Sequence, residues 1–491
     1  MSVKLVYKDI AVGAAEDAAV TTTDAQDISD VTRLPETADT PPVATGEWNM
    51  WLLNGTRKVY ANQPIAFWST EMSGADGTLQ TPPAVTIAFD QQYTSLGITL
   101  YFARAAGEFC SSVTLKWYKE GELLSSKDYQ PDSAVYFCEN TVAAYDQLTV
   151  ELYATSLPYR YARIDGILFG ISREFTARNL RSVSVGQEID LISSALPEDY
   201  CDWTLESPEA VDYIFQKKQP VEVYDGSSLV GVYYIESAKR RSATMYDIAC
   251  VDAIGVLDQS VFPEALYLTE TNAKAEIEKI LGDSFALEMD AALSGAVIKG
   301  YIPECTKREA LQYIAFALGA VVDTSGTAKI KVWLPDTGEP AEISAKNTFT
   351  GSDVETSDLV TKVIVTAYTI TDARPGEGDD SIQYNGVDYK CVPAEYAVES
   401  PDIVSTDKLN EMQYKECYLI NTDNGQEAAE RCYDYHARRQ VHSLSFKMNG
   451  EHIGDYVTTH TPWESVIVGN ITKMTMNFSN ITVADAEVLG S

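Results

Sequence analysis

Residues 301–333 read YIPECTKREALQYIAFALGAVVDTSGTAKIKVW and predict a structural brace, a helix followed by a hairpin. Thr306 and Glu309 have the spacing of a capping box, in which both side chains bond to free N–H groups at a helix start. Apolar side chains then recur at helical spacing, and Gly319 stands where the helix should end. Two β-rich runs around a Thr-Ser-Gly turn complete the hairpin. The apolar helix positions are Leu311, Ile314, Ala315 and Leu318.

The composition of the whole chain limits what its surface can bind. The chain has 491 residues, and its 72 acidic and 37 basic side chains give a formal net charge of −35. This length suits roughly three to five domains. Phosphate groups bind to Lys and Arg, so we expect no nucleic acid or anionic membrane on the general surface. The acidity favours either solubility or the repulsion of passing polyanions.

Tyrosine usage predicts a high content of β-strands, and cysteine usage predicts free thiols. Tyrosine is twice as common as phenylalanine, 29 against 14, which favours strands with half-exposed aromatic faces. The eight cysteines are scattered without a C-x-x-C pair, and most lie in apolar patterns, so we predict buried free thiols. The start, Met1 to Leu5, lacks the apolar core of a signal peptide, and no run reaches the length of a membrane span. We therefore expect synthesis in the cytosol.

Short β-rich runs separated by turn residues predict a mainly β fold with an α+β insert. Between residues 84 and 171 the runs have the spacing of a sandwich. A hairpin around Asp225 and Gly226 is typical of a small barrel. The predicted domains are an extended N-terminal arm and β segment at 1–72, a jelly-roll sandwich at 73–171, a first β-barrel at 172–258, an α+β domain at 259–345, and a second β-barrel at 346–491 with a helix near 425–440.

Three features, in this order, resemble the baseplate hub and tail-tip proteins of long-tailed bacteriophages and related contractile injection systems. The first is the pair of barrel strands at 220–226 and 231–235, followed by the strand at 248–253. The second is the helix opening at 305–311 with its hairpin, and the third is the late helix that leads into residues 454–457 and 468–472. The resemblance covers about residues 172–491.

The resemblance implies two hub-type β-barrels in each subunit, so that a homotrimer presents six-fold geometry on one face. The implied function is that of a structural protein that joins the hexameric tail tube to the trimeric tip and surrounds the DNA channel. The implied partners are the tail tube or distal tail protein, the tape-measure protein, a tip, spike or receptor-binding protein, and DNA only in transit. The implied location is the virion, assembled in the bacterial cytoplasm.

The jelly-roll segment departs from the minimal pattern of this family. Residues 117–121 and 163–167 make it look like an inserted galactose-binding-type module, similar to modules on tail proteins of phages that infect Gram-positive bacteria. The alternative function is therefore binding of host cell-wall carbohydrate. The candidate glycan-binding residues are Trp117, Tyr118, Tyr159 and Arg163. Packing in a core or interface is the other interpretation of these aromatic residues.

The remaining motifs do not indicate an enzyme. The four histidines, at 436, 442, 452 and 460, cluster in sequence but lack zinc-pair spacing. Residues 421–425 lack the glutamate of a calcium loop. Ser405 to Lys408 matches S-x-x-K, but the partner motifs of acyl-serine enzymes do not follow. There is no G-x-S-x-G, P-loop or H-E-x-x-H motif. The sequence therefore predicts no catalytic residue, metal or cofactor.

Overall fold

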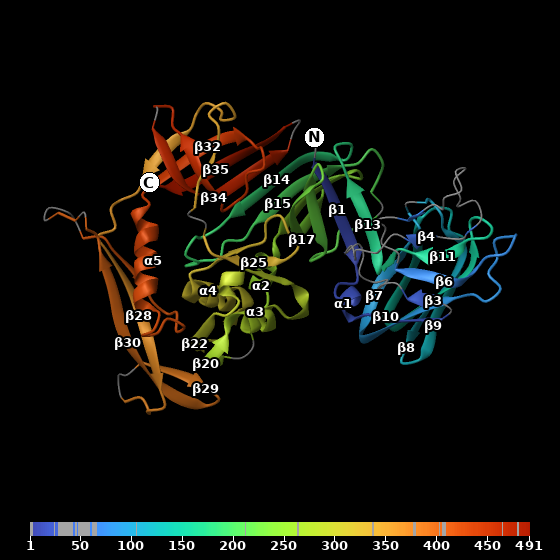
Figure 1. Cartoon of the computed structure of the whole chain (residues 1–491), viewed down its shortest axis with the longest axis horizontal. Coiled ribbons are helices and arrows are strands. Elements are labelled where there is room, and N and C mark those ends of the chain that lie inside the picture. The colour runs from blue at the N-terminus through green and yellow to red at the C-terminus, as the bar shows by residue number, and fades with distance from the viewer. Residues whose placement is uncertain are drawn as a thin grey trace. The chain divides into compact units, whose positions relative to one another are not determined.

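The computed structural model divides the chain into two compact units (Figure 1). Unit 1 comprises Met1–Tyr7 and Glu174–Ser491, and unit 2 comprises Lys8–Arg173. Most of the elements are strands, which confirms the mainly β prediction, and the helices concentrate in an α+β insert. The structure describes residues 3–491 except 24, 28–42, 45–46, 48–58, 61–65, 105, 212, 263–264, 336–337, 377–379, 402, 405–408, 464 and 479–480. Half of the predicted N-terminal range 1–72, and the S-x-x-K match, lie outside the described residues.

Unit 1 is built on a sheet with thirteen strands among the described residues. Its main path runs through β13 (Gly170–Phe175), β1 (Val3–Ile10), β16 (Pro220–Asp225), β17 (Ser228–Arg240), β18 (Met245–Val251), β15 (Tyr200–Glu206), β14 (Leu180–Glu188), β34 (Val466–Phe478), β35 (Thr482–Gly490), β32 (Gln440–Lys447) and β27 (Asp353–Thr356). The strands β33 (Tyr456–His460) and β26 (Ala341–Glu342) extend it from β34. The strands of both predicted barrels are therefore hydrogen-bonded into one sheet.

The first half of this sheet, from β13 to β14, is rolled around an aromatic core. Strands β13 and β15 are five places apart, which would separate them by about 24 Å in a flat sheet. Yet the rings of Phe175 in β13 and Trp203 in β15 have centroids only 5.3 Å apart. Phe215, from the segment between β15 and β16, contacts both rings and also Tyr7 of β1. The half is therefore curled around Phe215.

The second half of the sheet closes on itself. Strands β33, β34, β35 and β32 pair in this order. The segment at 341–349 then joins the two outer strands, because Ile343 donates its N–H to the Thr458 carbonyl in β33 while Phe349 donates to Ser445 in β32. Across the interior, Nδ1 of His442 lies 2.8 Å from the hydroxyl oxygen of Thr459. The result is a small closed β structure.

The two halves meet where β14 pairs with β34. This ladder runs from Ser184 opposite Asn477 to Glu188 opposite Lys473. One continuous hydrophobic core follows the junction, and it contains side chains from both halves, such as Val185 and Met476. The junction therefore joins the halves through backbone hydrogen bonds and through shared apolar burial.

Strand β1 completes the first half from the opposite end of the chain. Val3 lies opposite Asp225 and Tyr7 opposite Val221, in antiparallel register with β16. The sequence prediction placed residues 1–72 in a separate arm and β segment. The structure instead adds the first strand to the first half, a contact across more than two hundred residues for which no local pattern exists.

The α+β insert contains the brace as predicted. Helix α4 (Lys307–Leu318) begins at Thr306 with both bonds of the capping box, and it ends at Gly319 with φ 68°. Strands β24 (Val321–Asp323) and β25 (Ile330–Trp333) form the predicted hairpin, with β21 (Leu287–Met289) added in parallel. Helices α2 (Ala253–Asp258) and α3 (Ala273–Leu281) pack on α4. The pairs β20 (Leu266–Asn272) with β22 (Val297–Ile302), and β19 (Val261–Phe262) with β23 (Cys305–Thr306), complete the insert.

The second predicted barrel range contains a segment that packs with the insert. A separate sheet has the order β29 (Ser381–Tyr384), β30 (Val387–Glu399), β28 (Lys362–Thr371) and β31 (Glu411–Tyr414). Helix α5 (Gly425–Ala437) lies along β28 and β30 (Figure 1). Buried side chains of α5 and β28 belong to the same core as those of α4. Residues 362–437 are therefore a part of the α+β region.

Unit 2 is a β structure of two sheets on one core. The larger sheet has the order β12 (Gly166–Leu168), β7 (Ala84–Tyr101), β10 (Val135–Thr155), β8 (Cys110–Lys119) and β9 (Glu122–Tyr129), with β2 (Ala19–Thr23) also on β7. The smaller sheet joins β11 (Tyr161–Ile164), β6 (Phe67–Met72) and β3 (Ala25–Asp27), and helix α1 (Ala14–Asp17) precedes β2. Phe67 and Ile164 of the smaller sheet share a core with Ile87 and Leu148 of the larger one.

The buried face of α4 supports a prediction on stability. Leu311 has no exposed surface, and its removal should leave a cavity in the brace. We expect Leu311→Ala to lower the free energy of unfolding of unit 1 by about 2–5 kcal/mol. The volume-conserving control Leu311→Met should cost less than about 1.5 kcal/mol. Denaturant titration followed by circular dichroism measures both, and equal losses would contradict the cavity argument.

A second prediction concerns Gly300 in β22. Its φ is 139°, and a Cβ there would lie 2.0 Å from the carbonyl oxygen of Tyr418, so both backbone conformation and contact require glycine. We expect Gly300→Ala to lower the melting temperature well beyond any effect of Gly295→Ala, whose Cβ would enter open space. Similar melting temperatures for the two variants would show that the β22 backbone moves away freely.

Candidate functional site

The four candidate glycan-binding residues do not share a surface. Trp117 is fully buried, because β8 alternates and its side chain points with Leu115 into the core of unit 2. Arg163 is only 3 % exposed. Tyr118 is half-buried, and Tyr159 is exposed in the segment after β10. Trp117 is therefore a core residue, and the prediction that it stacks on a sugar is wrong.

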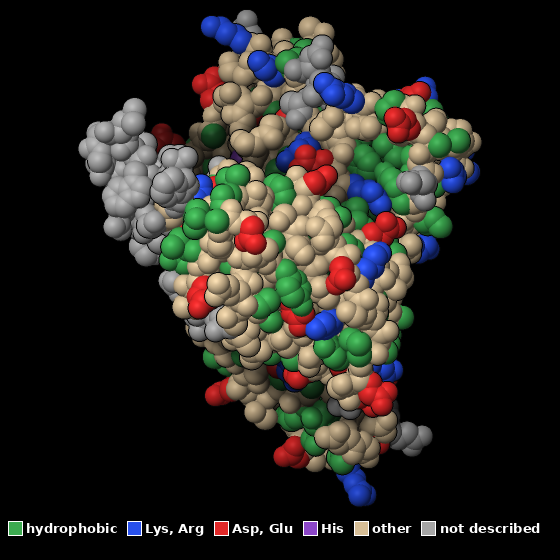
Figure 2. Space-filling model, turned by 90° about the vertical axis from the view of Figure 1, so that its right-hand side faces the viewer, with side chains coloured by type: hydrophobic (Ala, Val, Ile, Leu, Met, Phe, Trp, Pro, Cys, Tyr) green, Lys and Arg blue, Asp and Glu red, His purple; other side chains and the backbone are tan. Residues whose placement is uncertain are grey.

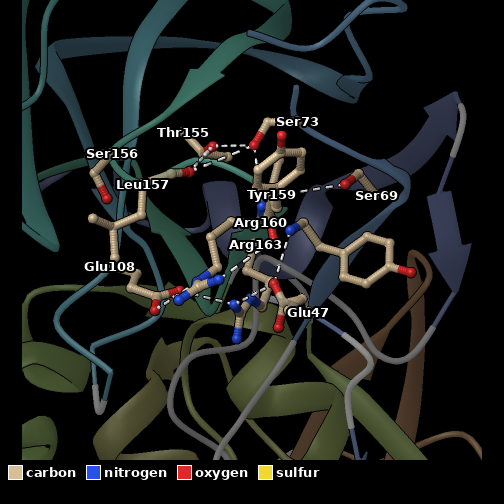
Figure 3. A network of polar contacts seen from close by, with 12 residues as sticks. Glu47, Ser69, Ser73, Glu108, Thr155, Ser156, Leu157, Tyr159, Arg160 and Arg163 are labelled. Carbon is tan, nitrogen blue, oxygen red and sulfur yellow. Dashed lines mark hydrogen bonds and ion pairs between the residues drawn. The ribbon is translucent and has the colours of Figure 1, made fainter. Parts of the chain in front are cut away.

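Arg163 belongs to a buried ion-pair network (Figure 3). One guanidinium nitrogen of Arg163 lies 2.8 Å from a carboxylate oxygen of Glu47 and 2.9 Å from one of Glu108. Nε of Arg160 lies 3.0 Å from the other Glu108 oxygen. Two cations thus face two carboxylates in a protein interior, where ion pairs require close geometry to offset desolvation. The charge of Arg163 serves this network and does not face a ligand site.

Hydroxyl groups beside the ion pairs hold the loop that carries Tyr159 (Figure 3). The Thr155 hydroxyl lies 2.6 Å from the Ser73 hydroxyl and donates to the Leu157 carbonyl. Ser73 accepts the N–H of Arg160 at 3.1 Å. Tyr159 has a φ of 56°, a left-handed conformation that is uncommon for a tyrosine. The network therefore fixes an unusual loop with an exposed aromatic ring.

The space beside this network is too small for a sugar. It is lined by residues that include Glu108, Arg160 and Arg163, and its volume is about 10 Å³. A single water molecule already needs about that much room. The ion pairs of unit 2 therefore act as a structural anchor between β11, Glu47 and the segment before β8.

Most of this network could not be predicted from the sequence. Arg163 was a candidate residue, but Glu47 and Glu108 lie 116 and 55 positions away from it in the sequence. The available signal was the pair of arginines at 160 and 163, only three positions apart in a β-rich run. An arginine in a buried strand predicts a carboxylate nearby, because a buried charge is costly unless it is paired.

Unit 1 contains a larger cleft between the insert and the second half of the sheet. Its volume is about 590 Å³, and its lining combines acidic, basic and apolar side chains. Glu288 and Glu339 are acidic members, Lys331 is a basic one, and Trp333 and Ile453 are apolar ones. The Trp333 ring packs on the backbone of Gly454, where a Cβ would come within 2.6 Å of the ring. The cleft therefore lies along the contact between the insert and the second half of the sheet.

The four histidines have separate partners in the structure. His436 contacts the Tyr414 hydroxyl, His442 contacts Thr459, His452 lies near Asp455, and His460 lies near Glu342. Burial lowers the pKa of His442 and His436. Among the described residues, no group of three or more His, Cys, Asp or Glu side chains is arranged to hold a metal ion. The cysteines are free thiols, seven of them buried, as the sequence predicts.

The outer surface that Figure 2 shows carries acidic and basic side chains interspersed with hydrophobic ones. None of the described helices combines the length and the apolar character that a membrane crossing requires.

The solved structures that resemble part of this chain include the following three. A tail protein of Neisseria meningitidis MC58 is 14 % identical, with 64 % of this chain and 93 % of that chain covered and a TM-score of 0.47. The 43 kDa tail protein of prophage MuSo2 from Shewanella oneidensis is 9 % identical, with 65 % and 96 % covered and a TM-score of 0.45. Prophage tail protein gp18 of Listeria monocytogenes EGD-e is 12 % identical, with 65 % and 92 % covered and a TM-score of 0.42.

All three are tail proteins. In each case about two thirds of this chain corresponds to nearly the whole neighbour. No protein-family model matches the chain. No curated protein matches its sequence.

The ion-pair network of unit 2 supports a prediction. Removing the Glu108 carboxylate deprives two buried guanidinium groups of one counter-charge, so Glu108→Ala should destabilise unit 2 by about 3–5 kcal/mol. Glu122→Ala, at an exposed position of β9, is the matched control and should change stability by less than about 0.5 kcal/mol. Urea unfolding followed by tryptophan fluorescence measures both. A loss as small as that of the control would show that the network contributes no stability.

Proposed function

We propose that three copies of this chain form a ring that acts as the structural hub at the distal end of a phage tail. The observation that carries the proposal is the pair of rolled β structures joined side by side within one chain at β14 and β34. Three copies bring six such structures together. A ring of this kind can match a hexameric tail tube on one face while it keeps three-fold symmetry on the other.

The insert supplies the three-fold part of this proposal. It occurs once per chain and packs on both halves of the sheet. Its contacts include a hydrogen bond from the Ser193 hydroxyl to the Ala320 carbonyl, and the packing of Trp333 on Gly454. We infer that the insert and the sheet of β28 to β31 face the tip, while the rolled halves face the tube or distal tail protein.

The remaining partners follow from the same arrangement. A central channel would admit the tape-measure protein during assembly and DNA in transit, and a tip, spike or receptor-binding protein would attach on the three-fold side. The net charge of −35 favours a channel wall that repels DNA and so prevents its adsorption during ejection. The proposed location is the virion, with assembly in the bacterial cytoplasm. The role is structural and requires no catalytic residue.

The alternative function, binding of cell-wall carbohydrate by unit 2, has less support. Trp117 is buried and Arg163 forms buried ion pairs, so the side chains of two of the four candidate residues are not available to a sugar. Tyr118 and Tyr159 remain accessible in part. We therefore favour a decorating or spacing role for unit 2 over a sugar-binding one.

The oligomeric state tests the proposed function. We expect size-exclusion chromatography with light scattering to show a species of three times the 54.0 kDa chain, alone or after addition of the tail-tube protein. Negative-stain images of the mixture should show rings with six-fold character on one face. A monomer that persists at all concentrations, both alone and with the tube protein, would contradict the proposal.

A further inference from the structure

A buried histidine lies inside the closed second half of the sheet. His442 of β32 has no exposed surface, and neither has Thr459 of β33. Buried positions alternate along β32, so His442 points inward together with Leu444 and Phe446. Strands β32 and β33 are also the two strands that segment 341–349 joins by backbone hydrogen bonds. The contact between His442 and Thr459 therefore crosses the same gap that this segment closes.

One ring nitrogen of His442 has a hydrogen-bond partner, and the other has none among the described residues. Nδ1 lies 2.8 Å from the hydroxyl oxygen of Thr459. That hydroxyl donates its own proton to the Ile467 carbonyl at 3.3 Å, so it accepts from His442, and Nδ1 carries the ring proton. Nε2 is buried without a partner in the part of the chain that the structure describes. The neutral ring thus satisfies Nδ1 and leaves only the lone pair of Nε2 unpaired.

A second proton on this ring would have to bind at Nε2. The imidazolium form is a donor at both nitrogens, so its Nε2–H would be buried without an acceptor among the described residues. The residues directly opposite His442 on the neighbouring strands are Val354 of β27 and Val488 of β35, which offer neither a charge nor a hydrogen bond from their side chains. A buried charge is costly unless it is paired and hydrogen-bonded. The closed structure therefore accepts the neutral ring and disfavours the charged one.

Charged groups lie on the elements around His442, but none of the following is buried. They are Asp353 and Glu355 of β27, Asp485 and Glu487 of β35, His460 of β33, Lys473 of β34, Glu342 of β26, Lys346 after β26 and Lys447 of β32 itself. Burial lowers the pKa of His442 below its ordinary value of 6.5, and the carboxylate of Asp353 offsets a part of this effect. The surrounding charges therefore do not compensate a proton in the interior.

We propose that His442 makes the closure of the second half sensitive to acid. The neutral ring holds β32 to β33 across the interior, and a proton at Nε2 breaks this closure, because the charged ring must reach water. Segment 341–349 then separates from the two strands that it joins. This property belongs to the single chain and does not depend on the proposed ring of three copies.

The direction of the pH dependence follows from linkage. The pKa of His442 in the closed form lies below that of a solvated histidine, so the open form binds the proton more tightly. The stabilisation by the neutral ring is therefore complete above about pH 6.5, and it is lost as the pH falls below this value towards the lowered pKa. Acid should open the closure, and neutral pH should keep it closed.

Hydrogen exchange on the full chain, read by mass spectrometry at pH 5 to 8, tests the proposal. After correction for intrinsic exchange rates, the opening constant of segments 341–349 and 441–447 should rise by up to about tenfold per pH unit below about pH 6.5. In His442→Asn the side-chain amide can still donate to Thr459 but takes up no proton. Its opening constant should therefore change less than about twofold over the same range.

A control and a second removal of the imidazole complete the exchange experiment. His452→Asn is the matched control, because His452 precedes β33 but is exposed near Asp455, and it should retain the wild-type pH dependence. His442→Leu removes the titrating group in a second way if His442→Asn does not fold. A flat wild-type profile, or an unchanged slope in the His442 variants, would overturn the proposal.

A measurement on the His442 ring itself needs no variant at this position. The chain has four histidines, so the signals of ¹³Cε1-labelled histidine can be assigned by substituting the other three one at a time. The His442 signal should remain that of a neutral ring at about pH 6, where a solvated histidine is mostly protonated. A His442 signal that titrates at about pH 6.5 with the exchange profile unchanged would also overturn the proposal.

Discussion

The short antiparallel ladder between β14 and β34 is the constraint on which unit 1 depends. It aligns Ser184 with Asn477 and Glu188 with Lys473, and it makes one sheet of two rolled halves. Because side chains alternate along a strand, a slip of one residue would turn Val185 and Met476 away from their common core. The ladder therefore determines both the continuity of the core and the relative placement of the halves. The proposed assembly needs this placement, since six similar elements from three chains require a constant junction within each chain.

Apolar burial and polar contacts have different roles in placing the insert. The core around α4 supplies the stabilisation, but apolar contacts alone specify orientation weakly. Directed bonds add the orientation: Arg308 donates to the Leu196 carbonyl, and Ser193 to the Ala320 carbonyl. Arg431 of α5 donates to the Phe316 carbonyl near the end of α4 and so connects the two helical segments. Each bond joins residues more than a hundred positions apart, so the insert is held by contacts that form only when the whole unit has folded.

The two units use buried charge in opposite ways. In unit 2, Arg160 and Arg163 face Glu47 and Glu108, so each buried cation has a carboxylate partner. In unit 1, the buried carboxylates of Asp199 and Asp252 instead accept hydrogen bonds from the N–H groups of Glu188 and Gly255 and from the Thr324 hydroxyl.

The sequence by itself determined those helix ends and hairpin turns that depend on only a few neighbouring residues. The capping box of Thr306, the stop at Gly319 and the hairpin around Gly226 follow from backbone chemistry that a short window contains. Only the tertiary structure decided that β1 joins β16, that Trp117 points inward and that residues 362–437 pack with the insert. The same is true of the candidate site in unit 2, in which Glu47 meets Arg163, and of the contact in unit 1 between Thr324 and Asp252. These contacts join residues about 70 to 220 positions apart, and their free energy comes from burial and from charge compensation, which depend on the environment of a side chain and not on its neighbours in sequence.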